Sequence, residues 1–292
     1  MEPGPSPPTP FGWCALGCEN CVCQFGVRLS LGATLPPRRS AAIIVAAAAL
    51  LLPGACAAFA SGPAACPAAL GLCRVSGGDQ VVSNEQTFTT WANPLGDGAV
   101  VRTLPNRAAA GLDALHMMTS DGLPEVYVVL RLRSVPTGRS SAETWAEIRL
   151  PTRRAGETGW VPRGALGDFN QVTTQLVVDR AADRLWLLAD GKVIFTAPVG
   201  IGRRSSPTPA GHFWIREGFP VVASARAAYG PYALGTSAYS VFPGWPGGGV
   251  IGIHGTSHPI VGPSTFGCVT LRDDEDLRLA GLVSIGTPVW VK

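Results

Sequence analysis

One cysteine and one histidine near the end of the chain have the residue types and spacing for nucleophilic catalysis. His254 ends a strand-like run at 250–254, and Cys268 follows fourteen residues later, after a loop containing glycine and proline. A strand end and the loop after it can bring the imidazole to the thiol, take its proton and leave a nucleophilic thiolate. Gly267 permits a tight turn, so the N–H groups of Gly267 and Cys268 can face a developing oxyanion. Such a thiol suits attack on an amide carbonyl and a thioester intermediate.

The same two residues also have an ordinary explanation. A lone cysteine is often a small buried apolar residue, and a nearby carbonyl can satisfy a histidine at a strand end. The catalytic interpretation is favoured because Cys268 is the only cysteine between residues 74 and 292, and an exported free thiol needs a reason. A thiol–imidazole pair requires no cofactor. His258, in a loop, lacks the helical spacing of a metal pair with His254, so neither a cofactor nor a metal is expected.

The start of the chain has the pattern of a secretory signal. Arg38 and Arg39 precede twelve apolar residues at 41–52, and small residues follow. This stretch is shorter than the roughly 20 residues of a membrane span, and its flanks are those of a signal peptide. We predict a leader over 1–60 and an exported protein of the cell envelope. A twin-arginine signal, an uncleaved anchor, lipidation at Cys56 with membrane attachment, and a later start codon remain open.

Composition excludes several classes of protein. Charged residues make up 15% of the 292-residue chain and the formal net charge is +3, which fits neither a charge-driven disordered chain nor a nucleic-acid-binding face. The 36 glycines and 26 prolines indicate many turns and argue against a helical bundle. Apolar residues, at 46%, are sufficient for a buried core.

The body of the chain predicts two β units after a linker at 61–85. A small β module is predicted over 86–166, with a helical patch near 108–118. Its strands are predicted at 99–104, 126–132, 145–150 and 159–161. From 172 to 292 a second β domain is predicted, with a hairpin turn at Asp190-Gly191 and a short helix capped by Asp273. Its strands are predicted at 175–178, 184–188, 192–199, 211–216, 250–254 and 287–291. The fold class is mainly β.

Several ordered motifs within 172–292 resemble the L,D-transpeptidase catalytic domain. They are Val199–Gly202, Pro207–Phe213, Ala233–Thr236, Ile253–Thr256, Thr265–Cys268 and Gly286–Val289. The resemblance implies a β-sandwich-like domain that remodels bacterial peptidoglycan stem peptides. It implies attack on the amide after the diamino acid at position three, loss of the terminal D-alanine, and resolution of the thioester by a side-chain amine of a second stem. In the preceding module, Ile148–Pro151 and Thr158–Pro162 resemble the closing strands of bacterial SH3-like domains.

The resemblance also implies residue roles. Cys268 corresponds to the nucleophile, His254 to the general base, and the Gly255 carbonyl to the group that orients the imidazole, while the N–H groups of Gly267 and Cys268 would form the oxyanion hole. The predicted substrate-binding residues are Tyr232, Tyr239, Thr256 and Thr265. The two tyrosines could equally be ordinary sheet aromatics.

Two positions depart from the family pattern. Phe266 stands where many members have histidine, and Thr270 stands where arginine or asparagine is usual. The departures leave two alternatives open beside a cross-linking transpeptidase: a non-catalytic wall-binding protein with a degenerate domain, and an L,D-carboxypeptidase with water as acceptor. The oligomeric state is also open.

Overall fold

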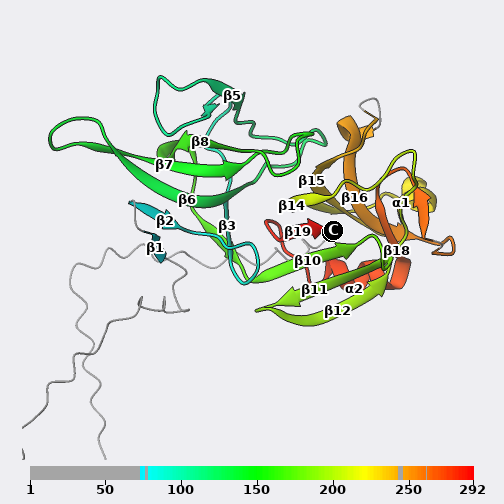
Figure 1. Cartoon of the computed structure of the whole chain (residues 1–292). Coiled ribbons are helices and arrows are strands. Elements are labelled where there is room, and N and C mark those ends of the chain that lie inside the picture. Colours follow the sequence, from blue (N-terminus) through cyan, green and yellow to red (C-terminus); the bar gives the residue numbers. More distant parts are fainter. Residues whose placement is uncertain (1–72, 76–77, 243–245, 261) are drawn as a thin grey trace, which may run out of the picture. The chain divides into compact units, whose positions relative to one another are not determined.

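A computed structural model describes residues 73–75, 78–242, 246–260 and 262–292 (Figure 1). The chain divides into two units, Met1–Ala60 and Ser61–Lys292, and every described residue belongs to the second. The predicted leader therefore lies outside the described residues. Within the described part of the chain, no helix combines the length and apolar character needed to cross a bilayer.

The first sheet is built by residues 73–172. Its strands follow the order β1-β2-β6-β7-β8-β4-β5, and β3 pairs with both β6 and β9. The elements are β1 (Cys73–Val75), β2 (Asp79–Val81), β3 (Thr89–Ala92), β4 (Val100–Arg102), β5 (Gly111–Ala114), β6 (Tyr127–Pro136), β7 (Ala142–Arg149), β8 (Thr158–Pro162), the 3-10 turn η1 (Arg163–Ala165) and β9 (Asn170–Val172). The four predicted strands of the module are confirmed as β4, β6, β7 and β8.

Two expectations for this region differ from the structure. The linker predicted over 61–85 contains β1 and β2, because β2 pairs antiparallel with β6 and so extends the sheet. The helical patch predicted near 108–118 is wrong: β5 lies there and pairs with β4. Gly111 and the turn residues around it offset the helix-forming alanines, and pairing with a neighbouring strand decides the outcome.

The second sheet carries the chemistry-bearing residues. Its order is β12-β11-β10-β19-β14-β15-β16-β18, and β13 and β17 form a separate small sheet. The strands are β10 (Thr174–Asp179), β11 (Arg184–Ala189), β12 (Lys192–Pro198), β13 (Ile201–Gly202), β14 (Gly211–Pro220), β15 (Tyr232–Tyr239), β16 (Val250–Thr256), β17 (Pro263–Thr265), β18 (Val269–Arg272) and β19 (Pro288–Val291). The helical elements are η2 (Ala223–Ala225), α1 (Arg226–Tyr229), η3 (Pro246–Gly249) and α2 (Asp273–Ala280). The predicted strands of this domain are confirmed, and the fold is mainly β.

Local sequence explains the hairpin between β11 and β12. Asp190 and Gly191 have φ values of 48° and 74°, which confirms the predicted turn with two positive φ angles. In β11, Leu185 and Leu187 are fully buried, as strand alternation requires for a core-facing side. Buried apolar side chains from strands between β10 and β19 and from α2 form one core cluster.

The helix after β18 begins differently from the prediction. Arg272, not Asp273, occupies the N-cap position of α2, and no side chain caps the helix. Asp273 is the first helical residue instead. The first turn contains four acidic residues, which the positive end of the helix dipole favours.

Contacts join the two sheets of the second unit directly. The indole Nε1 of Trp214, on β14, donates to the Val126 carbonyl oxygen at 3.0 Å. Arg216, also on β14, forms a buried ion pair with Glu125. A Cβ placed on Gly286 would lie 2.0 Å from Trp91 Cδ1, so only glycine fits against β3 at this point. The module is therefore packed against the second sheet through its 124–128 segment.

Candidate active site

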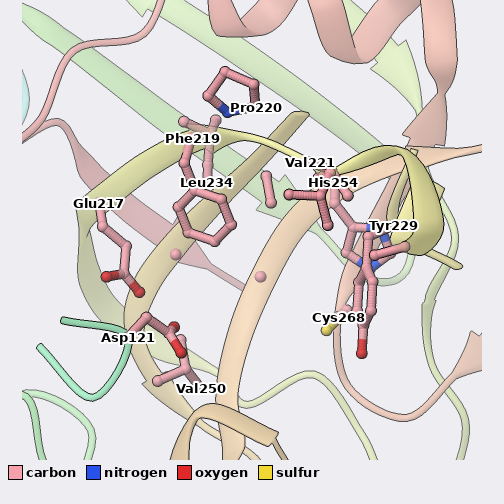
Figure 2. A pocket seen from close by; sticks show the side chains of 15 residues that line it. Asp121, Glu217, Phe219, Pro220, Val221, Tyr229, Leu234, Val250, His254 and Cys268 are labelled. Carbon is pink, nitrogen blue, oxygen red and sulfur yellow. The ribbon is translucent and has the colours of Figure 1, made fainter. Parts of the chain in front are cut away.

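A cavity of about 320 Å³ lies against β15 and β16, and both Cys268 and His254 line it. Figure 2 shows the two side chains at one end of the cavity, together with Tyr229 from α1. Phe219, Val221 and Leu234 contribute apolar walls. Residues that are distant in sequence thus share one concave surface, as a catalytic pair and its substrate would require.

His254 is held in one orientation by the backbone. Its side chain is buried, with 6% of the residue exposed, and Nδ1 lies 2.8 Å from the Gly255 carbonyl oxygen. A carbonyl can only accept, so Nδ1 carries the proton and Nε2 is left with its lone pair. The Tyr229 ring meets the imidazole edge-on at 5.2 Å between centroids. Burial lowers the pKa of His254, against the opposing effects of the Gly255 carbonyl and the Asp273 charge.

Cys268 immediately precedes β18, which runs parallel to β16. The cysteine is free and partly exposed. A Cβ placed on Gly252 would lie 3.7 Å from His254 Cδ2 and 4.0 Å from Cys268 Sγ, so the imidazole and the thiol flank the bare backbone of this glycine. Burial raises the pKa of the Cys268 thiol, although a hydrogen bond from the Gly252 backbone opposes the shift. Near neutral pH the pair is therefore a neutral thiol beside a neutral imidazole.

The turn before Cys268 is held by side-chain hydroxyls. Gly267 has a φ of 121°, which suits glycine, and its N–H donates to Thr265 Oγ1 at 3.1 Å. Thr208 Oγ1 donates to the Gly267 carbonyl at 2.8 Å, and Ser206 Oγ donates to the Phe266 carbonyl at 2.6 Å. The expectation that the Gly267 N–H points at an oxyanion therefore needs correction, because Thr265 already occupies it. The Cys268 N–H is the remaining candidate.

The other predicted substrate-binding residues lie outside this cavity. The Tyr239 hydroxyl accepts from Arg216 Nη1 at 3.0 Å, and Tyr232 packs against the core of the domain. Thr256 Oγ1 accepts from the His258 N–H at 3.1 Å, beside a different hollow. Thr265 braces the turn and does not line the cavity. The Tyr239 hydroxyl and the Tyr232 ring therefore make contacts within the fold, and neither tyrosine lines the cavity.

The two departures from the family pattern have local explanations. The Phe266 ring is partly exposed, with the Arg203 guanidinium 3.7 Å from its centroid. Thr270 is buried, and a Cβ placed on the facing Gly200 would lie 2.4 Å from its Oγ1. A longer side chain at position 270 would need this space, so the small threonine matches the close approach of Gly200.

The sequence did not predict that a carboxyl group of the helix would lie behind His254. Asp276 on α2 is fully buried, and its Oδ2 accepts from the Tyr232 N–H at 3.1 Å. The Gly255 backbone also hydrogen-bonds to it, next to the peptide that follows His254. Burial raises the pKa of Asp276 to about 7. In a run of four acidic residues, only the packing of the helix determines which one faces inward.

Asp276 makes the stability of the protein depend on pH. The pKa of Asp276 is raised in the folded protein, so the neutral carboxyl group stabilises the fold. This stabilisation is fully present below the ordinary pKa of 3.8 and is lost as the pH rises through about 7. The whole effect is on the order of 4 kcal/mol. We expect the free energy of unfolding of Asp276→Asn, minus that of the wild type, to be larger at pH 8 than at pH 5. The asparagine amide stays neutral at both pH values and its oxygen can still accept from both N–H groups, whereas the wild-type carboxyl group is charged at pH 8. Urea unfolding at the two pH values measures this.

The control is Asp274→Asn on the same helix, since the Asp274 side chain is 65% exposed. The stability difference between Asp274→Asn and the wild type should be the same at pH 5 and pH 8. If the stability difference between Asp276→Asn and the wild type were the same at both pH values, the raised pKa of Asp276 would be contradicted.

The opposite end of the cavity is acidic. Glu217 on β14 and Asp121, from the loop between β5 and β6, line it there (Figure 2). Neither residue was predicted, because isolated acidic residues 96 positions apart carry no pairing signal in the sequence. Among the described residues, no group of three or more histidine, cysteine, aspartate or glutamate side chains is arranged to hold a metal ion.

The sequence and structure were compared with known proteins. Residues 173–291 match the family model described as YkuD, the L,D-transpeptidase catalytic domain. A protein of Bacillus subtilis (strain 168), named as a candidate L,D-transpeptidase YkuD, is 28% identical over 141 residues, covering 47% of this chain and 76% of the relative.

Solved structures of L,D-transpeptidases are similar to part of the chain. One variant from Enterococcus faecium is 24% identical, with a TM-score of 0.33, over 41% of this chain and 49% of its own. Another, from Mycobacterium smegmatis, is 18% identical, with a TM-score of 0.34, over 66% of this chain and 99% of its own. The chain therefore spans about half the length of the Enterococcus structure.

Proposed function

We propose, from the premise that residues 173–291 belong to the L,D-transpeptidase catalytic domain family, that this protein is an exported cysteine transpeptidase. It would cross-link peptidoglycan stem peptides through a thioester on Cys268. The observation that carries the proposal is the cavity that Cys268 shares with His254, whose Nδ1 is fixed against the Gly255 carbonyl. Export rests on the basic and apolar pattern of residues 38–52.

The acylation half of the reaction follows from the protonation states. His254 Nε2 takes the thiol proton as Sγ bonds to the carbonyl carbon of the diamino acid residue, which places the developing charge on the carbonyl oxygen. The Cys268 N–H is the backbone donor available for that oxygen. When the tetrahedral intermediate collapses, the C–N bond breaks and the imidazolium gives its proton to the departing D-alanine amine.

The second half regenerates the thiol. A neutral side-chain amine of another stem attacks the thioester carbonyl and gives a proton to His254. The C–S bond then breaks, the new amide forms, and the thiolate recovers a proton from the imidazolium. Water in place of the amine would give hydrolysis and a shortened stem, so the acceptor distinguishes a transpeptidase from a carboxypeptidase.

Two measurements test this function. We expect ertapenem, a carbapenem, to add covalently to the folded, reduced protein, with the adduct mapped to the peptide containing Cys268 and absent from Cys268→Ala. We also expect purified sacculi to release D-alanine and gain cross-links between third-position residues. Shortened stems without new cross-links would indicate the carboxypeptidase. If the protein formed no adduct and released no D-alanine, the enzymatic proposal would be overturned and the alternative of a wall-binding protein would stand.

A further inference from the structure

The active-site cavity connects the thiol with a pair of carboxyl groups. Glu217 is only 3% exposed, and its Oε2 accepts from Thr119 Oγ1 at 2.6 Å. Asp121 is exposed at the rim, on the same loop as Thr119. Figure 2 shows the two carboxyl groups together, across the cavity from Cys268. The pair is thus formed by one residue from the second sheet and one from the preceding module.

The pair has no cationic partner within the described residues. Arg216 precedes Glu217, but its guanidinium is bound to Glu125 and to the Tyr239 hydroxyl. Burial raises the pKa of Glu217, and the hydrogen bond and negative charge of Asp121 raise it further, while Thr119 and Arg216 act in the opposite direction. The Glu217 carboxyl group therefore holds a proton more readily than an ordinary glutamate does. A cation that reached the pair could replace that proton.

The cavity walls between the carboxyl pair and the Cys268 thiol indicate which kind of cation would fit. Phe219, Val221 and Leu234 line the cavity between the carboxyl pair and the thiol, and their side chains are apolar. An alkyl chain would pack against these walls, and a terminal ammonium would meet the carboxyl pair. A peptide with an aminoalkyl side chain near its reacting carbonyl has this combination of groups.

We infer that Glu217 and Asp121 are specificity-determining residues that receive the primary ammonium group of an aminoalkyl side chain of the substrate. This inference rests on the proposed function, because it takes the cavity beside Cys268 as the substrate pocket. The ammonium belongs to the stem that acylates Cys268. The side-chain amine of the resolving stem must instead be neutral and next to the thioester, across the cavity from the carboxyl pair.

The binding test compares two peptides that differ only in charge. The probes are L-Ala-γ-D-Glu-L-Lys-D-Ala and its Nε-acetyl derivative, titrated by calorimetry into Cys268→Ala protein at pH 8. We expect the charged peptide to bind about tenfold more tightly, or about 1.4 kcal/mol. Adding Glu217→Gln or Asp121→Asn should reduce the ratio toward one, whereas Asp113→Asn, an exposed acid on β5, should leave it unchanged. The ratio should fall toward pH 5, because the raised pKa of Glu217 favours the neutral form of that carboxyl group at lower pH.

Turnover by the wild type tests the same preference during acylation. With the donor peptide alone, we expect D-alanine release to be faster from the charged peptide than from its Nε-acetyl derivative. Equal binding of both peptides at pH 8, with equal rates of D-alanine release, would overturn the inference, as would a preference that persists in the Glu217→Gln/Asp121→Asn double variant. Preferential binding without adduct or D-alanine release would instead contradict the proposed function and retain the inference.

Discussion

Replacing His254 by glutamine should slow acylation by ertapenem at pH 7 by about 10²–10⁴-fold, the usual contribution of a general base. Burial raises the pKa of the Cys268 thiol, so little thiolate exists at neutral pH without a base beside it. Burial also lowers the pKa of His254 below the ordinary value of 6.5, so most of the wild-type imidazole is already neutral at pH 6.5. The wild-type rate should therefore be level around neutral pH and decline only below about 6.5. The variant's rate should instead increase steadily with pH up to the alkaline range.

Stopped acylation reactions analysed by intact mass between pH 5 and 10 give both profiles. His258→Gln is the matched control, because His258 is exposed and lies outside the cavity. It should follow the wild-type curve. A His254→Gln rate within threefold of wild type at pH 7, or a curve of the same shape, would exclude His254 as the base.

Truncating Glu125 to alanine should destabilise the protein by about 3–5 kcal/mol, because it leaves a buried guanidinium without its counter-ion. The side chains of Arg216 and Glu125 are only 4% and 2% exposed, and Arg216 Nε donates to Glu125 Oε1 at 2.8 Å. Replacing both residues by methionine removes both charges and should be near neutral or stabilising by about 1–4 kcal/mol. Urea unfolding measures each free energy.

The control for this prediction is an exposed ion pair in the same module. Arg107 and Glu143 have side chains that are 76% and 23% exposed, so Glu143→Ala should cost less than about 1 kcal/mol. If Glu125→Ala lowered the free energy of unfolding no more than Glu143→Ala, the prediction that removing Glu125 leaves a costly buried charge would be wrong.

The strands of the second sheet were predictable where the sequence pattern is strong. The Asp190-Gly191 turn and the apolar alternation of β11 fix one hairpin locally. β15 was not predicted as a strand, because buried Thr236 and Ser237 interrupt its apolar pattern. Their hydroxyls bond within the sheet, Thr236 Oγ1 to the Ile251 carbonyl oxygen and Ser237 Oγ to the Trp214 N–H. Polar residues satisfied by distant backbone give no local signal.

The site was predictable to the extent that its chemistry lies in short motifs. His254 and Cys268 are close in sequence and line one cavity. The Gly267 N–H could not be assigned correctly, because its partner depends on the Thr265 rotamer. Asp276 and Glu217 could not be identified either, since their partners come from other elements of the fold. Long-range packing, which a linear pattern does not record, sets their roles.

The packing of the 124–128 segment on β14 affects how the chain can be divided. A fragment that starts at the family boundary near residue 173 would lose Glu125 and Asp121 and uncover Trp214, whose indole donates to Val126. Such a fragment would leave Arg216 without its counter-ion and the Trp214 indole without its acceptor, and its pocket would lack Asp121. The module and the second sheet are therefore one structural unit, and recombination between relatives would preserve the pocket only when the crossover does not separate Asp121 from Glu217.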